Sequence, residues 1–309
     1  MPETSSADNA GGRPVRLALV QNAGTGDDPA KTLADLVATA DKTLTEEPAD
    51  FLAFSEMAAT AYFCGTNDRR YFDWADTVPG RATEEFGKLA RKHSTHIWIP
   101  LFERGPRSGV YYNSAVLIGP DGEIIPGTLP DGTQVSAYRK NHLSDNYNAD
   151  PGTNEKFFFR PGPGFPVFDT EFGRVGALIC YDRSFPESWR MLALHGVELV
   201  FVFVAIFLRH RAKTWDFELR SAAVQNGFHV AAINKGGLEV VEAERLFSGR
   251  SLVIEPFGSV VAEAPADTGD VVLRHTIDLS EGDRHGHRYH YLRDRRPEIY
   301  RTLTTVTHV

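Results

Sequence analysis

The order of apolar, strand-like segments and amphipathic, helix-like segments restricts the fold of this chain more than any other feature. Each half carries two strand–helix units, then a strand and a hairpin, without a visible residue-level repeat. The expected elements are strands at 15–21, 49–56 and 95–105, helices at 28–46 and 80–94 and a hairpin at 110–125, then strands at 173–182, 197–206 and 228–237, helices at 186–196 and 214–227 and a hairpin at 249–264. This alternation predicts one α/β domain in which two sheets pack together with helices outside.

The chain is expected to form a single domain over residues 15–309, because no linker rich in Pro, Gly and Ser divides it. Residues 1–14 lack the apolar segment of a signal peptide and are interpreted as a disordered leader. The stretch 126–166 is rich in Gly, Pro, Asp and Asn, so long loops that carry function are expected there.

Charge and cysteine content exclude several function classes. A net charge of -8 argues against nucleic acid as a partner. The apolar run 197–208 is too short to cross a membrane and suits a buried strand. The chain has only two cysteines, Cys64 and Cys180, which favours a reducing compartment and a cytoplasmic location over a disulfide-bonded secreted scaffold.

Cys180 ends an apolar segment, directly before a charged turn that contains Pro186. A sharp turn from strand to helix presents a side chain at the carboxyl edge of a sheet, and a helix N-terminus lowers the pKa of a thiol. Cys180 is therefore a candidate nucleophile. A small buried apolar residue is the alternative interpretation, and position alone leaves both open.

Further candidates lie where other predicted strands end. Glu56 closes an apolar strand, as either a surface charge or a general base. Lys140 and His142 follow a short strand, and Glu155 precedes three phenylalanines. Taken singly, a solvated lysine, a hydrogen-bonded loop histidine and a loop carboxylate are the alternatives.

In this order, the segments "SEM", "YRKNHL" and "ICYDRSFPE" resemble the nitrilase superfamily of carbon–nitrogen hydrolases. The resemblance runs from about residue 15 to about residue 302 and includes "YYNSAVLIGPDGEI" and "NGFHVAAIN". It implies a four-layer α-β-β-α sandwich of two mixed sheets. It also implies a homodimer or larger homo-oligomer, with the C-terminal tail at a subunit interface.

The segments "YRKNHL", "EKFFFRPG" and "LRDRRPEIY" resemble the carbamoyl-amide hydrolase branch of this family. That branch comprises β-ureidopropionase, N-carbamoyl amino acid amidohydrolase and N-carbamoylputrescine amidase. True nitrilases typically carry Trp and Glu after the cysteine, whereas Tyr181, Asp182 and Arg183 follow it here.

The resemblance implies a Glu56–Lys140–Cys180 triad that hydrolyses an N-carbamoyl amino acid or amine to the free amine, carbon dioxide and ammonia. Cys180 would attack the carbonyl carbon, and Glu56 would carry the protons. Lys140 and the backbone N–H of Tyr181 would stabilise the oxyanion. Glu155 would hydrogen-bond the lysine and help to place a small-molecule substrate. No metal or organic cofactor is expected.

The pocket wall is open to two interpretations. A carboxylated substrate would need donors, for which His142, Arg183, Arg209 and His210 are the candidates. A cationic substrate would instead need acids or aromatic rings from the inserted loop 144–152, which contains Asp145, Tyr147 and Asp150. An aliphatic amidase, a nitrilase or an acyl transferase of the same fold are the alternative activities. The histidines of the C-terminal part are not interpreted as a metal site: His285, His287 and His290.

Overall fold

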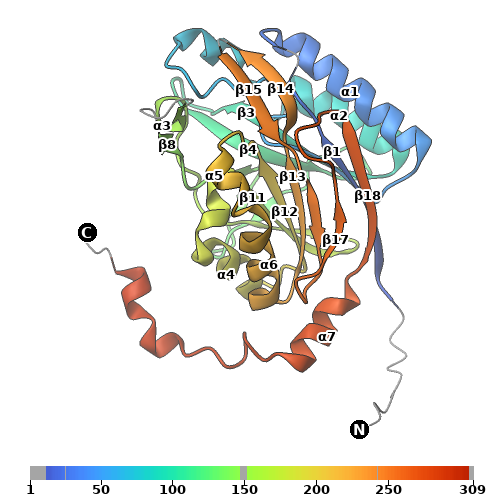
Figure 1. Cartoon of the computed structure of the whole chain (residues 1–309), viewed down its shortest axis with the longest axis vertical. Helices are drawn as coiled ribbons and strands as arrows, with labels where there is room; N and C mark the ends of the chain where they lie inside the picture. The colour runs from blue at the N-terminus through green and yellow to red at the C-terminus, as the bar shows by residue number, and fades with distance from the viewer. Residues whose placement is uncertain (1–11, 25, 147–151, 242, 306–309) are drawn as a thin grey trace.

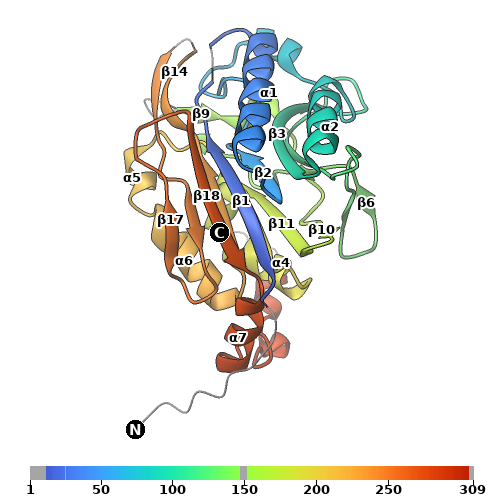
Figure 2. The ribbon, with the colours of Figure 1, turned by 90° about the vertical axis from the view of Figure 1, so that its right-hand side faces the viewer.

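A computed structural model describes residues 12–24, 26–146, 152–241 and 243–305 and shows two large β-sheets packed face to face (Figures 1 and 2). The six-stranded sheet has the order β18 (Val271–Asp278), β1 (Pro14–Gln21), β2 (Phe51–Phe54), β3 (His96–Arg104), β4 (Tyr111–Ile118), β7 (Tyr138–Arg139). The eight-stranded sheet has the order β17 (Val260–Glu263), β16 (Leu252–Ile254), β13 (His229–Asn234), β12 (Leu199–Val204), β11 (Gly173–Ile179), β10 (Val167–Thr170), β5 (Gly127–Thr128), β6 (Gln134–Val135). Both sheets are mixed, with parallel pairing in β1–β2–β3 and in β11–β12–β13.

Helices cover the outer faces of both sheets, so the four-layer α-β-β-α prediction is confirmed (Figure 2). The first sheet is covered by α1 (Pro29–Glu46) and α2 (Arg81–His93), and the second by α4 (Pro186–Leu194) and α6 (Trp215–Asn226). Along β1, Leu17 and Leu19 face the second sheet, whereas Ala18 and Val20 pack with the buried residues of α1 and α2. Alternate side chains of a strand point to opposite faces, so β1 contributes to two cores.

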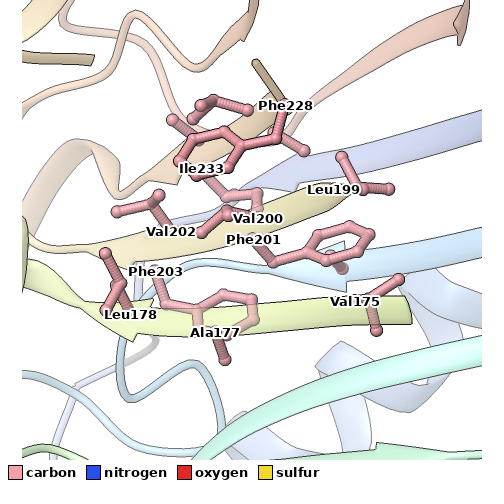
Figure 3. Close-up of a cluster of buried hydrophobic side chains, with 14 of the residues drawn as sticks. Val175, Ala177, Leu178, Leu199, Val200, Phe201, Val202, Phe203, Phe228 and Ile233 are labelled. Carbon is pink, nitrogen blue, oxygen red and sulfur yellow. The ribbon is translucent and has the colours of Figure 1, made fainter. Parts of the chain in front are cut away.

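Aromatic side chains fill the space between the sheets. Phe201 and Phe203 project from β12 (Figure 3), and the Phe201 ring centroid lies 5.3 Å from that of Phe51 in β2. Trp98 of β3 lies 5.5 Å from Phe203, again between ring centroids. Close packing of these rings fixes the distance between β2 and β11. The relative position of the strand ends that carry the site follows from that distance.

The strand–helix units lie close to where the sequence predicts them. Helix α1 begins after Asp28, whose carboxylate accepts hydrogen bonds from the backbone N–H groups of Ala30 at 2.9 Å and Lys31 at 3.0 Å. The predicted hairpin at 249–264 is β16–β17, and Gly258 in its turn has φ +84°. The predicted hairpin at 110–125 is wrong in part, because β4 pairs with β3 and β7. The second arm of that hairpin reduces to a single bridge between Ile118 and Ile124.

Two features of the sheets escape the sequence analysis. The hairpin of β14 (Gly236–Val241) and β15 (Ala243–Ser248) stands apart from both sheets. Strand β18 pairs antiparallel with β1, which begins at Pro14. Pro14, assigned to the leader, therefore belongs to a strand, and the rest of that prediction falls mainly on residues 1–11, outside the described part.

The remaining short elements lie in the connections and after the last strand. They are η1 (Arg69–Trp74), β8 (Asp145–Asn146), β9 (Thr153–Asn154), α3 (Glu155–Phe158), η2 (Cys180–Ser184), α5 (Arg209–Ala212), α7 (Ser280–Arg288), η3 (Pro297–Ile299) and η4 (Arg301–Thr304). Within the described ranges, no helix has both the length and the apolar character needed to cross a membrane. After α7 the chain lies outside the two sheets and passes below α6 and α4 in the view of Figure 1.

Candidate active site

Three of the predicted site residues follow strand ends that belong to different sheets. Glu56 comes two residues after β2, and Lys140 directly follows β7 at the edge of the first sheet. Cys180 directly follows β11 in the second sheet. Because β2 and β11 are both members of parallel sets, their carboxyl ends are the positions where an α/β fold presents a site.

Lys140 joins two carboxylates in a fully buried cluster. Its Nζ lies 2.9 Å from Glu56 Oε1 and 2.6 Å from Glu155 Oε1, and all three residues are at most 1% exposed. Burial acts to lower the pKa of Lys140, but the charges of Glu155 and Glu56 outweigh it and hold that pKa well above its ordinary value. Lys140 is therefore a permanent ammonium.

Glu155 opens α3 and closes the base of the inserted loop. Its Oε2 accepts the Ser144 backbone N–H at 2.7 Å, and its own N–H donates to the Ser144 carbonyl at 3.0 Å. Burial raises the pKa of Glu155, while Lys140 counteracts that rise. Strands β8 and β9 pair across the same base. The contacts at the base hold Glu155 in place. An insertion between the paired ends costs little stability, because closure entropy grows slowly with loop length.

The Cys180 thiol sits in a strained and partly buried turn. Its φ of +46° lies in the left-handed region, which non-glycine residues rarely adopt. Burial, together with the Glu56 carboxylate, raises the pKa of the thiol to about 12, although Lys140 and Arg183 counteract this. The expected lowering by a helix N-terminus is therefore wrong, because η2 is a single short turn and desolvation dominates. At neutral pH the thiol needs a base.

Asp182 connects the segment that bears the thiol to the segment that bears Lys140. Its buried carboxylate accepts the Tyr138 hydroxyl at 2.5 Å and the backbone N–H of His142 at 2.8 Å. The Nδ1 atom of His142 lies 2.8 Å from the same carboxylate. Tyr138 and His142 flank Lys140, and Asp182 is two residues after Cys180. One buried acid therefore fixes the position of the Lys140 segment relative to the Cys180 turn.

Arg183 is buried directly behind the cysteine turn. Its Nη1 donates to the Cys180 carbonyl at 2.8 Å and lies 3.9 Å from the Cys180 sulfur. Its Nε is 3.3 Å from Glu218 Oε2 on α6. These contacts give Arg183 a part in shaping the cysteine turn.

Tyr181, the residue after Cys180, is exposed, and its ring packs against Phe185.

Of the other candidates for the pocket wall, His142 is half-buried, and Arg209, His210 and Asp145 are exposed. The ring of His142 stacks on Phe185 with centroids 3.7 Å apart. Arg209 is exposed at the start of α5, next to His210, which is also exposed. Asp145 pairs with Lys156 at 3.4 Å. Tyr147 and Asp150 lie outside the described residues.

Asn113 is a site residue that the sequence analysis missed. It lies in β4, is fully buried, and donates from Nδ2 to Glu56 Oε1 at 2.8 Å. Its backbone carbonyl accepts the Lys140 N–H at 2.9 Å. The available signal was the adjacent polar pair Asn113 and Ser114 inside an otherwise apolar strand, which is unusual unless both find partners.

Across the described ranges, no three His, Cys, Asp or Glu side chains gather so that they could hold a metal ion. His285 is instead buried, with its ring beside Tyr289. Cys64 is also buried, and its sulfur lies 4.0 Å from that of Met57. Burial raises the pKa of the Cys64 thiol well above its ordinary value, so Cys64 is not an available nucleophile.

The cluster combines the three groups that attack on an unreactive carbonyl requires. A partly buried thiol lies within the electrostatic field of a fixed ammonium and of the Glu56 carboxylate. The Oε2 atom of Glu56 is buried, and no protein donor among the described residues reaches it. A carboxylate oxygen in that state can accept a proton from a neighbouring group.

Comparisons with known proteins find similar sequences and structures over most of the chain. The carbon-nitrogen hydrolase family model matches residues 16–284. An N-carbamoylputrescine amidase of Solanum lycopersicum is 31% identical over 95% of this chain and 96% of its own length. A citrullinase of Francisella tularensis is 30% identical, with 93% and 96% covered. The crystal structure of a carbon-nitrogen hydrolase from Helicobacter pylori superposes with a TM-score of 0.84 at 28% identity, covering 94% of this chain and 99% of that one.

Proposed function

The chain belongs to the carbon-nitrogen hydrolase family, and from that premise we propose that it is a cysteine-dependent hydrolase of N-carbamoyl amino acids or amines. The observation that carries the proposal is the buried Lys140 ammonium, which is held between Glu56 and Glu155. Its charge acts on the Cys180 thiol. A structural ion pair needs one carboxylate; a second carboxylate and a thiol in the same field favour chemistry.

Cys180 forms a C–S bond with the carbamoyl carbon as its proton passes to Glu56. The oxyanion lies against the Lys140 ammonium and the backbone N–H of Tyr181. Glu56 then protonates the leaving nitrogen as the C–N bond breaks, which leaves a thiocarbamoyl enzyme. Water then forms a C–O bond with the carbamoyl carbon as Glu56 takes a proton from it. The C–S bond breaks, Glu56 returns the proton to the leaving sulfur, and the released carbamic acid gives carbon dioxide and ammonia.

The substrate class is supported by the names of the relatives, one an N-carbamoylputrescine amidase and the other a citrullinase. The distal end of the substrate decides which residues bind it: a carboxylate would need a donor such as Arg209, whereas an amine would need an acid such as Asp145. An aliphatic amidase would use the same cluster, and its products would include no carbon dioxide.

The decisive experiment is a panel of ureido acids, carbamoyl amines and plain amides, assayed for ammonia and carbon dioxide, with wild type and Cys180→Ala. We expect carbon dioxide and ammonia from ureido compounds, and a loss of at least about 10⁴-fold in kcat for the variant. Turnover of plain amides alone would assign an amidase. Full activity of Cys180→Ala, or loss of wild-type turnover on chelation with no effect of thiol alkylation, would refute the mechanism.

We also propose that the chain associates into a homodimer or larger homo-oligomer. The segment after α7 leaves the sandwich (Figure 1) and exposes apolar side chains, with Ile299 at 64% and Leu303 at 66%. Apolar surface of this kind is stabilised by burial against a partner. Sedimentation of wild type and of an Ile299→Ser, Leu303→Ser double variant tests this, and a monomeric wild type would contradict it.

A further inference from the structure

The two oxygens of the Glu56 carboxylate have very different surroundings. Oε1 accepts from Asn113 Nδ2 at 2.8 Å and from Lys140 Nζ at 2.9 Å. Oε2 is equally buried, but no protein donor in the described ranges reaches it. Two donors on Oε1 and none on Oε2 favour one orientation of the carboxylate, so its two oxygens keep different surroundings.

Asn113 is placed to act on Glu56 and on Lys140 together. Its side-chain amide contacts the carboxylate, while its backbone carbonyl accepts the N–H of Lys140 at 2.9 Å. It belongs to β4, between β3 and β7, where the ladder on both sides restrains it. An ionised carboxylate only accepts hydrogen bonds, so it selects the amide orientation in which Nδ2 faces it.

We propose that Asn113 is a positioning residue that, with Lys140, holds Glu56 Oε1 so that Oε2 alone carries the catalytic proton. The inference rests on the proposed function and assigns each proton to one atom. Oε2 takes the proton of the Cys180 thiol as the C–S bond forms, and gives it to the leaving nitrogen as the C–N bond breaks. In the second half-reaction Oε2 takes a proton from water and returns it to sulfur.

Removal of the Asn113 amide should slow the chemical step and change its pH dependence. In Asn113→Ala the charged carboxylate loses an N–H donor, so its protonated form is favoured. We expect kcat to fall about 10- to 100-fold, the range for a lost hydrogen bond to a charged group. KM should change by less than about three-fold, and the acid limb of the kcat profile should move to higher pH.

Asn113→Asp is a second variant in which the side chain keeps its size. It therefore separates the loss of the hydrogen bond from the effect of a cavity, which Asn113→Ala would also create. A carboxylate facing Oε1 repels the charge on Glu56, so the acid limb should move further than in Asn113→Ala. Thermal unfolding of both variants shows whether they are folded. A shift in the folded Asp variant supports the proposal even if the Ala variant does not fold.

Ser114→Ala provides a matched control in the same strand. Ser114 is also fully buried and donates to a buried carboxylate, Glu103, at 2.5 Å. This variant should lose stability while keeping the wild-type pH profile. An unshifted acid limb in folded Asn113→Asp, or the same shift in Ser114→Ala, would overturn the role of Asn113. Either result would leave the Cys180 mechanism standing, provided that Cys180→Ala is inactive.

Discussion

At the scale of single residues, the unusual property of the site is a thiol, the proposed nucleophile, that burial keeps protonated. Burial and the Glu56 carboxylate raise the pKa of the Cys180 thiol to about 12. Since Glu56 contributes by its negative charge, Glu56→Gln should lower that pKa, and the thiolate should appear at lower pH than in wild type. Thiolate absorbance in the ultraviolet, titrated against pH with Cys180→Ser as the blank, measures this.

Glu85→Gln is a suitable control, because Glu85 pairs with Lys88 on the exposed side of α2 and leaves the charge around Cys180 unchanged. Its thiol should titrate as in wild type. If the Glu56→Gln thiol also titrated as in wild type, then the carboxylate would not act on the sulfur, and its role as the proton acceptor would lose its physical basis.

At the scale of elements, the β14–β15 hairpin holds the loop that follows Glu56. Glu239 in β14 accepts the backbone N–H of Gly24 at 2.7 Å and that of Tyr62, and it pairs with Lys235 at 2.9 Å. Lys235 and Glu239 are almost completely buried. Lys235→Met would leave a buried carboxylate without its cation, so we expect a loss of about 3–5 kcal/mol in the free energy of unfolding. Urea unfolding measures it.

A comparison with an exposed pair isolates the effect of burial. Lys31 pairs with Asp35 at 2.5 Å on the outer face of α1, with side chains 60% and 46% exposed. Lys31→Met should therefore leave the unfolding midpoint close to that of wild type. Equal losses in the two lysine variants would show that the hairpin is not held by its buried ion pair.

At the scale of the whole molecule, a buried histidine links folding to pH. His229 in β13 lies 3.2 Å from Glu281 of α7, between Nε2 and Oε2. Burial nevertheless lowers its pKa to about 4, and Arg284 and His275 add to this against the attraction of Asp278. The folded protein therefore holds His229 neutral. Its Nε2–H is free to donate to Glu281.

The lowered pKa of His229 makes the folded protein less stable as the pH falls. The ordinary pKa of histidine is 6.5. At a pH between about 4 and 6.5, His229 therefore takes up a proton in the unfolded chain but not in the folded one. The stability that it contributes is present above pH 6.5 and is lost toward pH 4, by about 1.4 kcal/mol per pH unit. Urea unfolding across this window should give a shallower slope for His229→Phe than for wild type. His287→Ala, on the exposed side of α7, should keep the wild-type slope; parallel curves for all three would contradict the prediction.

Local patterns in the sequence were enough to predict the layers and the types of the candidate site residues. Apolar residues at spacing two or at helical spacing are local signals, so strands and helices such as 15–21 and 28–46 could be read directly. The order of motifs around Glu56, Lys140 and Cys180 was sufficient to indicate the family. Pairing between distant segments is not a local signal, so the partnership of β18 with β1 was missed.

The contacts between polar atoms could not be predicted from local patterns, because they form between segments that are distant in the sequence. Asn113 and Asp182 were not singled out as site residues, because their partners lie on other strands and turns. Arg183, a candidate for the pocket wall, pairs with Glu218 of α6 and lies 3.9 Å from the Cys180 sulfur, contacts that no local pattern specifies. Whether a polar side chain serves as an anchor, a catalyst or a surface charge depends on the groups that replace its lost water. Those groups come together only when the two sheets pack.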